Sequence, residues 1–141
     1  MTHFVVDASV AAKWYLPEAE STQATGLLAS GNILSAPGLI YTEVANVFWK
    51  RVQRGELETA QARLFLLDFL SSPLVIENSP LLLEGAWNIA TRYNRSVYDS
   101  LYLALADDLG ATLVTADRRF YNALHETSWG DRLLWVGDLD A

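Results

Sequence analysis

The length and composition of the chain limit both the fold and the kinds of site that it can form. Its 141 residues are 51% hydrophobic and include five tryptophans, so we expect one compact domain spanning residues 1–141. The absence of cysteine excludes disulfides, thiolate nucleophiles and thiolate metal sites, so any metal must be bound by oxygen or imidazole. A net charge of -7 argues against a broad basic surface for binding nucleic acid.

The apolar segments give no sign of a membrane protein. No run approaches the roughly 18 uninterrupted apolar residues of a membrane-spanning helix, and the first residues lack the basic and apolar stretches of a secretory signal. We therefore expect a soluble, cytoplasmic protein without membrane association.

In the first half of the chain, short apolar strands alternate with helices. Pro17 ends the first helix, Gly31 the second and Gly55 the third, because these residues terminate helical hydrogen bonding. The expected elements are a strand at 4–6, helices at 8–15 and 18–30, a strand at 33–35, and helices at 39–54 and 58–70.

The second half repeats this alternation. Ser79 and Pro80 predict an N-cap and a first helical residue, and Gly110 predicts a helix end. Short apolar strands separated by helices are typical of a parallel sheet covered on both faces, so we expect a three-layer α/β/α fold with a short, mostly parallel central sheet. The remaining elements are a strand at 74–76, helices at 80–93 and 97–109, a strand at 112–115, a helix at 118–124 and a strand at 133–136.

Four acidic residues lie where such a sheet usually carries its functional groups, at the carboxyl ends of strands and the nearby helices. Asp7 ends the first strand and Asp117 follows the fourth. Glu43 lies in the helix at 39–54, and Asp99 lies near the start of the helix at 97–109. Three of the four interrupt strongly apolar segments, where an uncompensated carboxylate is costly. All four are candidate catalytic and metal-binding residues.

Each acid alone also has a structural interpretation. The three aspartates could cap the helices that follow them, and Glu43 could pair with Lys50 or Arg51. As a group they favour a cation, because clustered carboxylates repel one another. Mg²⁺, with Mn²⁺ as a substitute, takes oxygen ligands and retains waters. It could orient a phosphodiester, activate water and reverse the local sign of the field.

Several neighbouring polar residues are candidates for a supporting role. Ser9 and Thr115 each lie two residues from an acid and could orient a carboxylate or a metal-bound water, and Asn46 could do the same for Glu43. The alternative is that these side chains satisfy backbone groups. His3 and His125 stand alone without the spacing of metal ligands, so we interpret both as structural or surface residues.

Four segments, in this order and at these separations, resemble the PIN domain family, and within it the VapC-type toxin ribonucleases of bacterial and archaeal toxin-antitoxin pairs. The resemblance covers nearly the whole chain. The segments are Phe-Val-Val-Asp-Ala-Ser-Val at 4–10, Glu-Val-Ala-Asn-Val at 43–47, Val-Tyr-Asp-Ser-Leu-Tyr-Leu-Ala-Leu-Ala at 97–106 and Thr-Leu-Val-Thr-Ala-Asp-Arg-Arg-Phe at 112–120.

The resemblance implies a Mg²⁺-dependent endoribonuclease, with Asp7 and Asp99 as the principal metal ligands and the other two acids completing the site. It also implies single-stranded or structured RNA as the substrate, a homodimer and a cognate antitoxin whose tail covers the active site. Many relatives have a further acid shortly after the fourth, whereas this chain has Arg118 and Arg119. We therefore expect one metal rather than two, with these arginines contacting phosphate instead.

Two other functions fit parts of the sequence. A PIN-fold binding module without catalytic activity would not need all four acids. A receiver-like signalling domain would have paired acids after its first strand and a lysine after its last. Here the first strand ends in a single aspartate, and no lysine follows Lys50.

Overall fold

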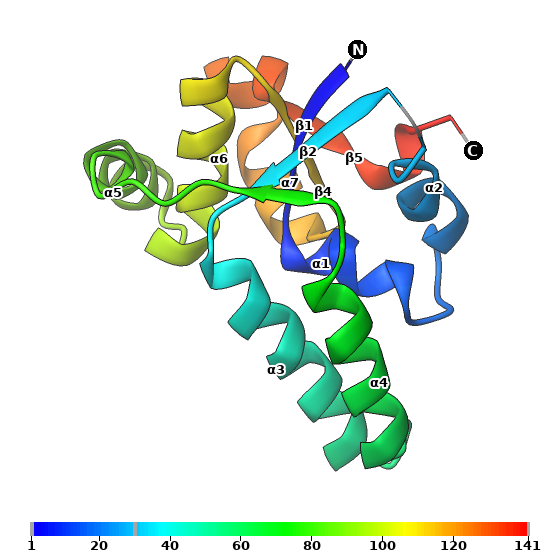
Figure 1. Cartoon of the computed structure of the whole chain (residues 1–141). Coiled ribbons are helices and arrows are strands. Elements are labelled where there is room, and N and C mark those ends of the chain that lie inside the picture. The colour runs from blue at the N-terminus through cyan, green and yellow to red at the C-terminus, as the bar shows by residue number, and fades with distance from the viewer. Residues whose placement is uncertain (1, 30, 141) are drawn as a thin grey trace.

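Five parallel strands form one sheet at the centre of the computed structural model, which describes residues 2–29 and 31–140 (Figure 1). Every strand pair is parallel, so all carboxyl ends lie along the same edge. In spatial order the strands are β3 (Leu74–Ile76), β2 (Asn32–Ala36), β1 (Thr2–Val6), β4 (Thr112–Thr115) and β5 (Leu133–Trp135).

Helices cover both faces of this sheet. Parallel strands are joined almost always by right-handed crossovers, which place α1–α4 on one face and α5–α7 on the other. The three-layer α/β/α fold is therefore confirmed. The helices are α1 (Ala8–Ala11), α2 (Ser21–Gly26), α3 (Leu39–Gln53), α4 (Thr59–Leu70), α5 (Leu82–Tyr93), α6 (Val97–Leu109) and α7 (Arg118–Leu124), with short 3₁₀ turns at Ala12–Trp14, Ser128–Arg132 and Val136–Asp138.

The core lies against the two central strands. Val5 and Val6 of β1 and Val114 of β4 are fully buried, as expected for strands covered on both faces. Helices α3 and α4 run beside each other and extend beyond the sheet as a two-helix arm (Figure 1). No helix among the described residues is long and apolar enough to cross a membrane.

Two helices differ clearly from the sequence-based expectation. The helix expected at 8–15 ends at Ala11 and continues as a 3₁₀ turn, because Tyr15 donates to the Ala12 carbonyl three residues back. The helix expected at 18–30 spans only Ser21–Gly26, since Glu20 has a φ of 62° and cannot join it; its expected end at residue 30 lies outside the described residues.

The remaining differences are smaller. The helix expected from Pro80 begins at Leu82, and the Ser79 hydroxyl accepts from Leu81 N in the preceding turn. The last strand ends at Trp135, one residue early. The α6 and β4 bounds match the expectation, and Gly110 ends α6 with a φ of 64°, which glycine adopts without the steric cost of a side chain.

The strand order determines where a site can form. From β1 the chain crosses to β2 and β3 on one side, and it then returns past β1 to β4 and β5 on the other. Loops therefore diverge between the carboxyl ends of β1 and β4, which is the point where open parallel sheets bind their ligands. Asp7 follows β1 and Asp117 follows β4, so both lie at this point.

Candidate functional site

Two hydroxyls and a backbone amide hold the Asp7 carboxylate. Ser9 Oγ donates to Oδ1 at 2.5 Å and Thr115 Oγ1 donates to Oδ2 at 2.5 Å. Val10 N also donates to Oδ1 at 3.1 Å, so Asp7 is the N-cap of α1. Asp7 can therefore cap the helix and belong to the candidate site at the same time. Its Oδ1 accepts from Val10 and Ser9, and its Oδ2, which accepts from Thr115, has a second lone pair with which to bind a metal.

The loop after β4 is tied to the loop after β1. Ala116 N donates to Ser9 Oγ at 2.9 Å, and Asp117 N donates to Thr115 Oγ1 at 3.0 Å. Asp117 in turn caps α7 by accepting from Phe120 N at 3.2 Å. Ser9 and Thr115 thus each donate to Asp7 and accept from the β4 loop, which fixes the two aspartates relative to each other.

Asp99 lies in the first turn of α6 but does not cap it. Ser96 is the N-cap and accepts from Asp99 N at 3.0 Å, so the capping interpretation of Asp99 is wrong. An acid in the first turn is favoured by the helix dipole. The Asp99 side chain is half-buried. Burial raises its pKa, the nearby charge of Asp117 adds to this rise, and that of Arg95 opposes it.

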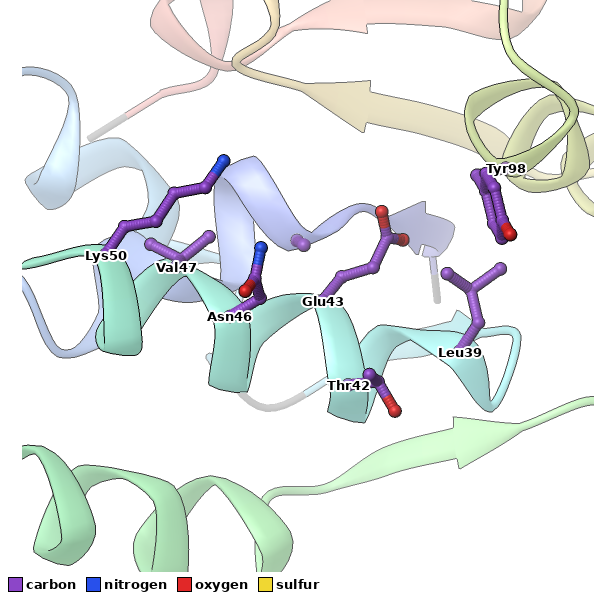
Figure 2. A pocket seen from close by; sticks show the side chains of 8 residues that line it. Leu39, Thr42, Glu43, Asn46, Val47, Lys50 and Tyr98 are labelled. Carbon is purple, nitrogen blue, oxygen red and sulfur yellow. The ribbon is translucent and has the colours of Figure 1, made fainter.

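Glu43 faces the same site from α3. Its Oε1 accepts from the Tyr102 hydroxyl at 2.6 Å, a contact between residues 59 positions apart. Figure 2 shows the Glu43 carboxylate directed away from the helix, with Asn46 and Lys50 following along α3. Asn46 is exposed and lines a groove along α3 together with Glu43. The sequence analysis named Asn46 as the residue that could orient Glu43, but the hydrogen bond to Glu43 comes from Tyr102.

Burial and mutual repulsion raise the pKa values of three of these acids. Burial raises the pKa of Asp7 from 3.8 to about 6, although the bonds from Ser9, Thr115 and Val10 act in the opposite direction. Burial is also the largest cause that raises the pKa of Glu43 and that of Asp99. Smaller contributions come from charge pairs that connect all four acids: Asp7 with Asp117, Asp117 with Asp99, and Asp99 with Glu43.

Tyr102 is the residue that the sequence analysis missed. It is buried in α6, three residues after Asp99 and thus on the same helix face. Burial, followed by the contact with Glu43, raises its pKa, so the phenol stays protonated and acts as a donor. The i, i+3 spacing from Asp99 was the available signal, but a tyrosine on an apolar helix face also fits an ordinary core position.

The four acids form a site with little compensating positive charge: Arg95 lies near enough to Asp99 to oppose the rise in its pKa, but it forms no ion pair with it. None of them makes an ion pair with a lysine, arginine or histidine among the described residues. Within the described parts of the chain, no three acidic or histidine side chains are arranged to hold a metal ion jointly. Mg²⁺ often takes only one or two protein carboxylates and keeps several waters, so oxygen donors spread in this way fit such an ion without a closed cage.

Arginines flank the acidic cluster on the β5 side. Arg118 and Arg119 are both exposed at the start of α7. The Arg118 guanidinium packs over the Trp135 ring, 3.6 Å from its centroid, an arrangement that restrains the side chain by cation–π attraction. Arg119 therefore has the more freely placed charge of the two.

The two histidines have structural contacts. His3 Nε2 lies 2.8 Å from Ser35 Oγ, which links β1 to β2. His125 stacks on Tyr121 with ring centroids 4.7 Å apart. The interpretation of both as structural residues is confirmed.

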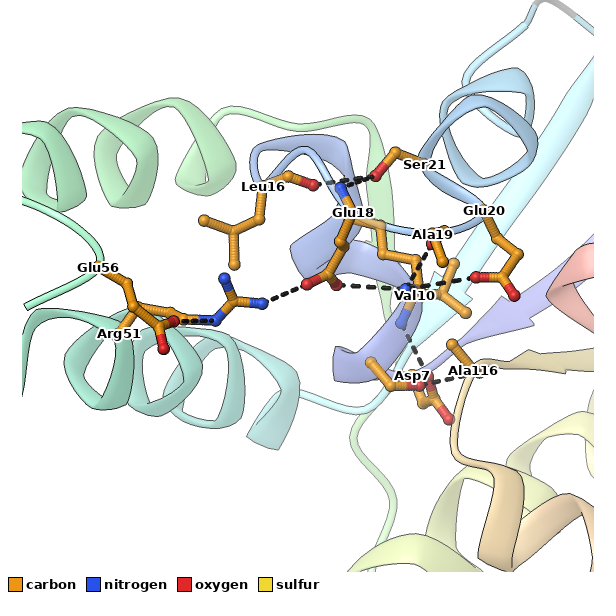
Figure 3. Close-up of polar contacts among 12 residues, drawn as sticks. Asp7, Val10, Leu16, Glu18, Ala19, Glu20, Ser21, Arg51, Glu56 and Ala116 are labelled. Atoms are coloured by element: carbon orange, nitrogen blue, oxygen red, sulfur yellow. Dashed lines mark hydrogen bonds and ion pairs between the residues drawn. The ribbon is translucent and has the colours of Figure 1, made fainter. Parts of the chain in front are cut away.

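A second group of charges joins the segment that follows α1 to α3 (Figure 3). We call it the α1–α3 ion-pair network, and its members are Lys13, Glu18, Arg51 and Glu56. Glu18 accepts from Lys13 Nζ at 3.2 Å and also pairs with Arg51. Arg51 Nε lies 3.4 Å from Glu56 Oε2. Arg51 is thus bound to Glu18 and Glu56, and the interpretation of Glu43 as its ion-pair partner is wrong.

A known protein family and several of its members match most of this chain. The PIN domain family model matches residues 4–124. Ribonuclease VapC3 of Pyrobaculum aerophilum is 35% identical over 117 residues, which cover 82% of this chain and 89% of that protein. Ribonuclease VapC1 of Mycobacterium tuberculosis is 35% identical over 123 residues, covering 84% and 89%.

Solved structures share the fold. PAE2754 from Pyrobaculum aerophilum superposes with a TM-score of 0.70 at 25% identity, covering 96% of this chain and 92% of that one. VapBC2 from Rickettsia felis, solved with a DNA fragment from its promoter, gives a TM-score of 0.66 at 17% identity, covering 95% and 97%. At the latter identity the likeness concerns the fold alone.

Proposed function

Because this chain belongs to the PIN domain family and its VapC group, we propose that it is a Mg²⁺-dependent endoribonuclease that acts as the toxin of a toxin-antitoxin pair. The observation that carries the proposal is the group of four acids, Asp7, Glu43, Asp99 and Asp117, which lie close enough for their charges to act on one another and form no ion pair among the described residues. The names of the relatives, ribonuclease VapC3 and ribonuclease VapC1, support the reaction class.

The acids differ in the part we assign to them. Asp7 and Asp99 would be the principal ligands of Mg²⁺ or Mn²⁺, and Glu43 and Asp117 would hold a metal-bound or attacking water. Bound there, the ion would lower the pKa of the attacking water and neutralise charge on the phosphate. Ser9 and Thr115 orient Asp7 by donating to both of its oxygens, and Tyr102 orients Glu43. Each of these donors restricts a carboxylate to one position before substrate binds.

The net negative charge of the chain favours contact with a short stretch of RNA over binding across a broad surface. With a net charge of -7 the chain cannot attract RNA over its whole surface. A divalent cation among the carboxylates would reverse the sign of the field locally. Arg119, exposed beside the site, and Arg118, restrained on Trp135, would then contact the phosphates next to the cleaved bond.

The partner assignments follow the family. We propose a single PIN domain over residues 1–141 that works in the cytoplasm, forms a homodimer and is inhibited by a cognate antitoxin. The VapBC2 relative, whose structure includes its promoter DNA, supports an antitoxin partner. Size-exclusion chromatography with light scattering, alone and with the product of the adjacent short gene, would measure both associations.

A cleavage assay tests the proposed function. The purified chain is incubated with total cellular RNA in Mg²⁺, in Mn²⁺ and in excess EDTA, and the new RNA ends are mapped by sequencing. We expect cleavage at defined sites with either ion and none in EDTA. Glu18→Gln, in the α1–α3 ion-pair network, is the matched control, because it removes an acid outside the site.

Two results would contradict the assignment. Full cleavage in EDTA would exclude a metal-dependent reaction. Absence of cleavage in either metal, by a chain that still binds its antitoxin, would instead favour the catalytically inactive PIN-fold binding module. The receiver-like alternative is not favoured by the comparisons, since the matching family is the PIN domain.

A further inference from the structure

A groove runs along α3 and opens onto the acidic site. It has a volume of about 590 Å³, within the range of sites that bind small ligands or parts of larger ones. Glu43 lines it directly, and two further lining residues, Ala8 and Tyr98, are the sequence neighbours of Asp7 and Asp99. A substrate held in this groove would therefore pass beside the carboxylates. We refer to it as the α3 groove.

The two ends of the α3 groove have different chemistry. At one end the Tyr98 side chain reaches from the start of α6 toward Leu39 (Figure 2). Tyr98 is 67% exposed, so most of its ring is available to a ligand. At the other end Lys50 is exposed, and it forms no ion pair with any acid in the described part of the chain.

The spacing of these ends suits a linear ligand. From Leu39 to Lys50 the helix rises about 16 Å, at about 1.5 Å per residue. The Glu43 carboxylate lies between them. A ligand that spans the groove thus meets an aromatic ring, then the acidic site, then the amide of Asn46 and a positive charge.

A single strand of RNA presents matching groups in that order. An unpaired base stacks on an exposed aromatic ring whatever its sequence, and a lysine binds a backbone phosphate as a point charge. An apolar peptide would match Tyr98 and Leu39 but would gain little from the exposed ammonium group of Lys50. A base-paired strand would keep its bases inside the duplex, away from the tyrosine.

We propose that the α3 groove binds single-stranded RNA, with a nucleobase stacked on Tyr98 and a backbone phosphate on Lys50. Tyr98 is the residue that positions the nucleotide next to the cleaved bond. The inference rests on the proposed nuclease function and adds the path of the substrate along α3 and the two residues that bind it.

Binding measured without cleavage tests this path. The full-length chain carrying Asp7→Asn serves as the inactive background, and the probe is a short fluorescein-labelled single-stranded RNA of mixed sequence in Mg²⁺. Anisotropy titrations compare Tyr98→Ala, Tyr98→Leu and Tyr98→Phe in this background. Removal of a stacking ring weakens binding by roughly tenfold or more per base, so Ala and Leu should lose affinity while Phe retains it.

Matched controls separate stacking from general surface effects. Trp87 on α5 is 61% exposed and is not among the residues that line the α3 groove, so Trp87→Ala should bind as the background does. Lys50→Gln should weaken binding and reduce the slope of log Kd against log salt by about 0.7, the value for one phosphate contact on a single strand. A duplex of the same sequence should bind more weakly than the single strand.

An abasic probe identifies the stacked base. When the base that meets Tyr98 is replaced by an abasic ribose, the background should lose the same affinity that Tyr98→Ala loses, and the two changes together should cost no more than either alone. Equal affinity of Tyr98→Ala, Tyr98→Leu and Tyr98→Phe for the single strand would overturn the inference. So would a Tyr98→Ala variant that loses affinity for the antitoxin alone, because the groove would then bind protein.

These outcomes are distinct from failure of the proposed function. If wild type cleaves RNA with Mg²⁺ but the Tyr98 variants bind normally, only the groove assignment is wrong. If wild type does not cleave at all, the nuclease assignment fails whatever Tyr98 does.

Discussion

Two clusters of charged side chains lie on this small domain, and they differ in how the charges are compensated. In the α1–α3 ion-pair network, Glu18 is held between Lys13 and Arg51. In the candidate site, Asp7 is held by the hydroxyls of Ser9 and Thr115, which are neutral. Both arrangements restrain a carboxylate, but only the first one neutralises it.

The difference shows which cluster needs something from outside the chain. A carboxylate paired with two cations contributes to the fold without a ligand. A half-buried carboxylate with neutral donors keeps its charge at a cost, and that cost is visible in the raised pKa of Asp7. Neutral donors hold the oxygens in place and leave the negative charge free to bind a divalent cation.

The largest difference between the two clusters should appear in cleavage. Asp7→Asn keeps the shape and the helix cap but removes the charge, so we expect RNA cleavage with Mg²⁺ to fall by about two orders of magnitude or more. Glu18→Gln makes the same chemical change in the other cluster and should leave the rate unchanged. Initial rates on one RNA substrate, with fold checked by circular dichroism, measure both. Equal losses in the two variants would remove the distinction.

Asp7→Asn should lose activity but gain stability, because it removes a charge that is unfavourable in the folded protein. The pKa of Asp7 is 3.8 in the absence of burial and about 6 in the folded chain. One pKa unit corresponds to about 1.4 kcal/mol. Asp7→Asn should therefore raise the free energy of unfolding at pH 7 in EDTA by about 1 to 3 kcal/mol. Urea denaturation of the two proteins measures this difference.

The stability difference between wild type and Asp7→Asn should depend on pH, because it arises from the charge of Asp7. Between pH 4 and 6 the folded state holds a proton on Asp7 that the unfolded state has released, so wild-type stability falls as the pH rises through this window. Below pH 4 and above pH 6 the difference in free energy of unfolding between wild type and Asp7→Asn should no longer change with pH. A stability difference that is the same at every pH would show that Asp7 is not buried in an unfavourable charged form.

Tyr102 offers an intermediate test of the acidic site. Tyr102→Phe removes the hydroxyl that donates to Glu43 at 2.6 Å and keeps the buried ring. We expect cleavage to fall by about tenfold, with a higher Mg²⁺ concentration needed for half-maximal rate, as for other residues that orient a metal-site carboxylate. Tyr15→Phe, in the aromatic cluster with Phe48 and Phe69, is the control. A lower rate without any change in Mg²⁺ dependence would contradict the orienting role.

The smallest expected effect concerns the ion-pair network. Glu18→Gln should lower the free energy of unfolding by about 1 kcal/mol, because it leaves Lys13 and Arg51 without their shared partner while both remain partly solvated. High salt should reduce this loss by screening. Urea denaturation at low and high salt measures it; a gain in stability would show that this cluster, too, carries uncompensated charge.

The sequence predicts those parts of the molecule that depend on local pattern. Apolar β-branched residues mark the strands, Gly110 ends α6, and Asp7 and Asp117 follow strands whose parallel order brings them together. The expectation that Ser9 and Thr115 orient a carboxylate is confirmed, but the pattern did not reveal that both donate to Asp7 or that Tyr102 donates to Glu43. Thr115 donates to a carboxylate 108 positions away and Tyr102 to one 59 positions away, and such contacts depend on how the layers pack.

Two of the structural alternatives, a Glu43–Arg51 ion pair and an Asp99 helix cap, are wrong for the same reason. Arg51 lies closer in sequence to Glu43 than to Glu18, yet it binds Glu18 because α3 directs it toward the loop after α1. Asp99 lies at a helix start, yet Ser96 supplies the cap because it is one turn earlier. Distance along the sequence suggests which residues can interact, but the direction in which each side chain leaves its helix determines which of them do.

We expect the acidic site, unlike the ion-pair network, to bind a divalent cation. This expectation is tested most directly by thermal unfolding in EDTA and in excess Mg²⁺, with wild type, Asp99→Asn and Glu18→Gln compared at pH 7. A ligand that binds only the folded state raises the midpoint of unfolding. We expect Mg²⁺ to raise the Tm of wild type and Glu18→Gln but not that of Asp99→Asn. An equal Tm for wild type in Mg²⁺ and in EDTA would contradict the account.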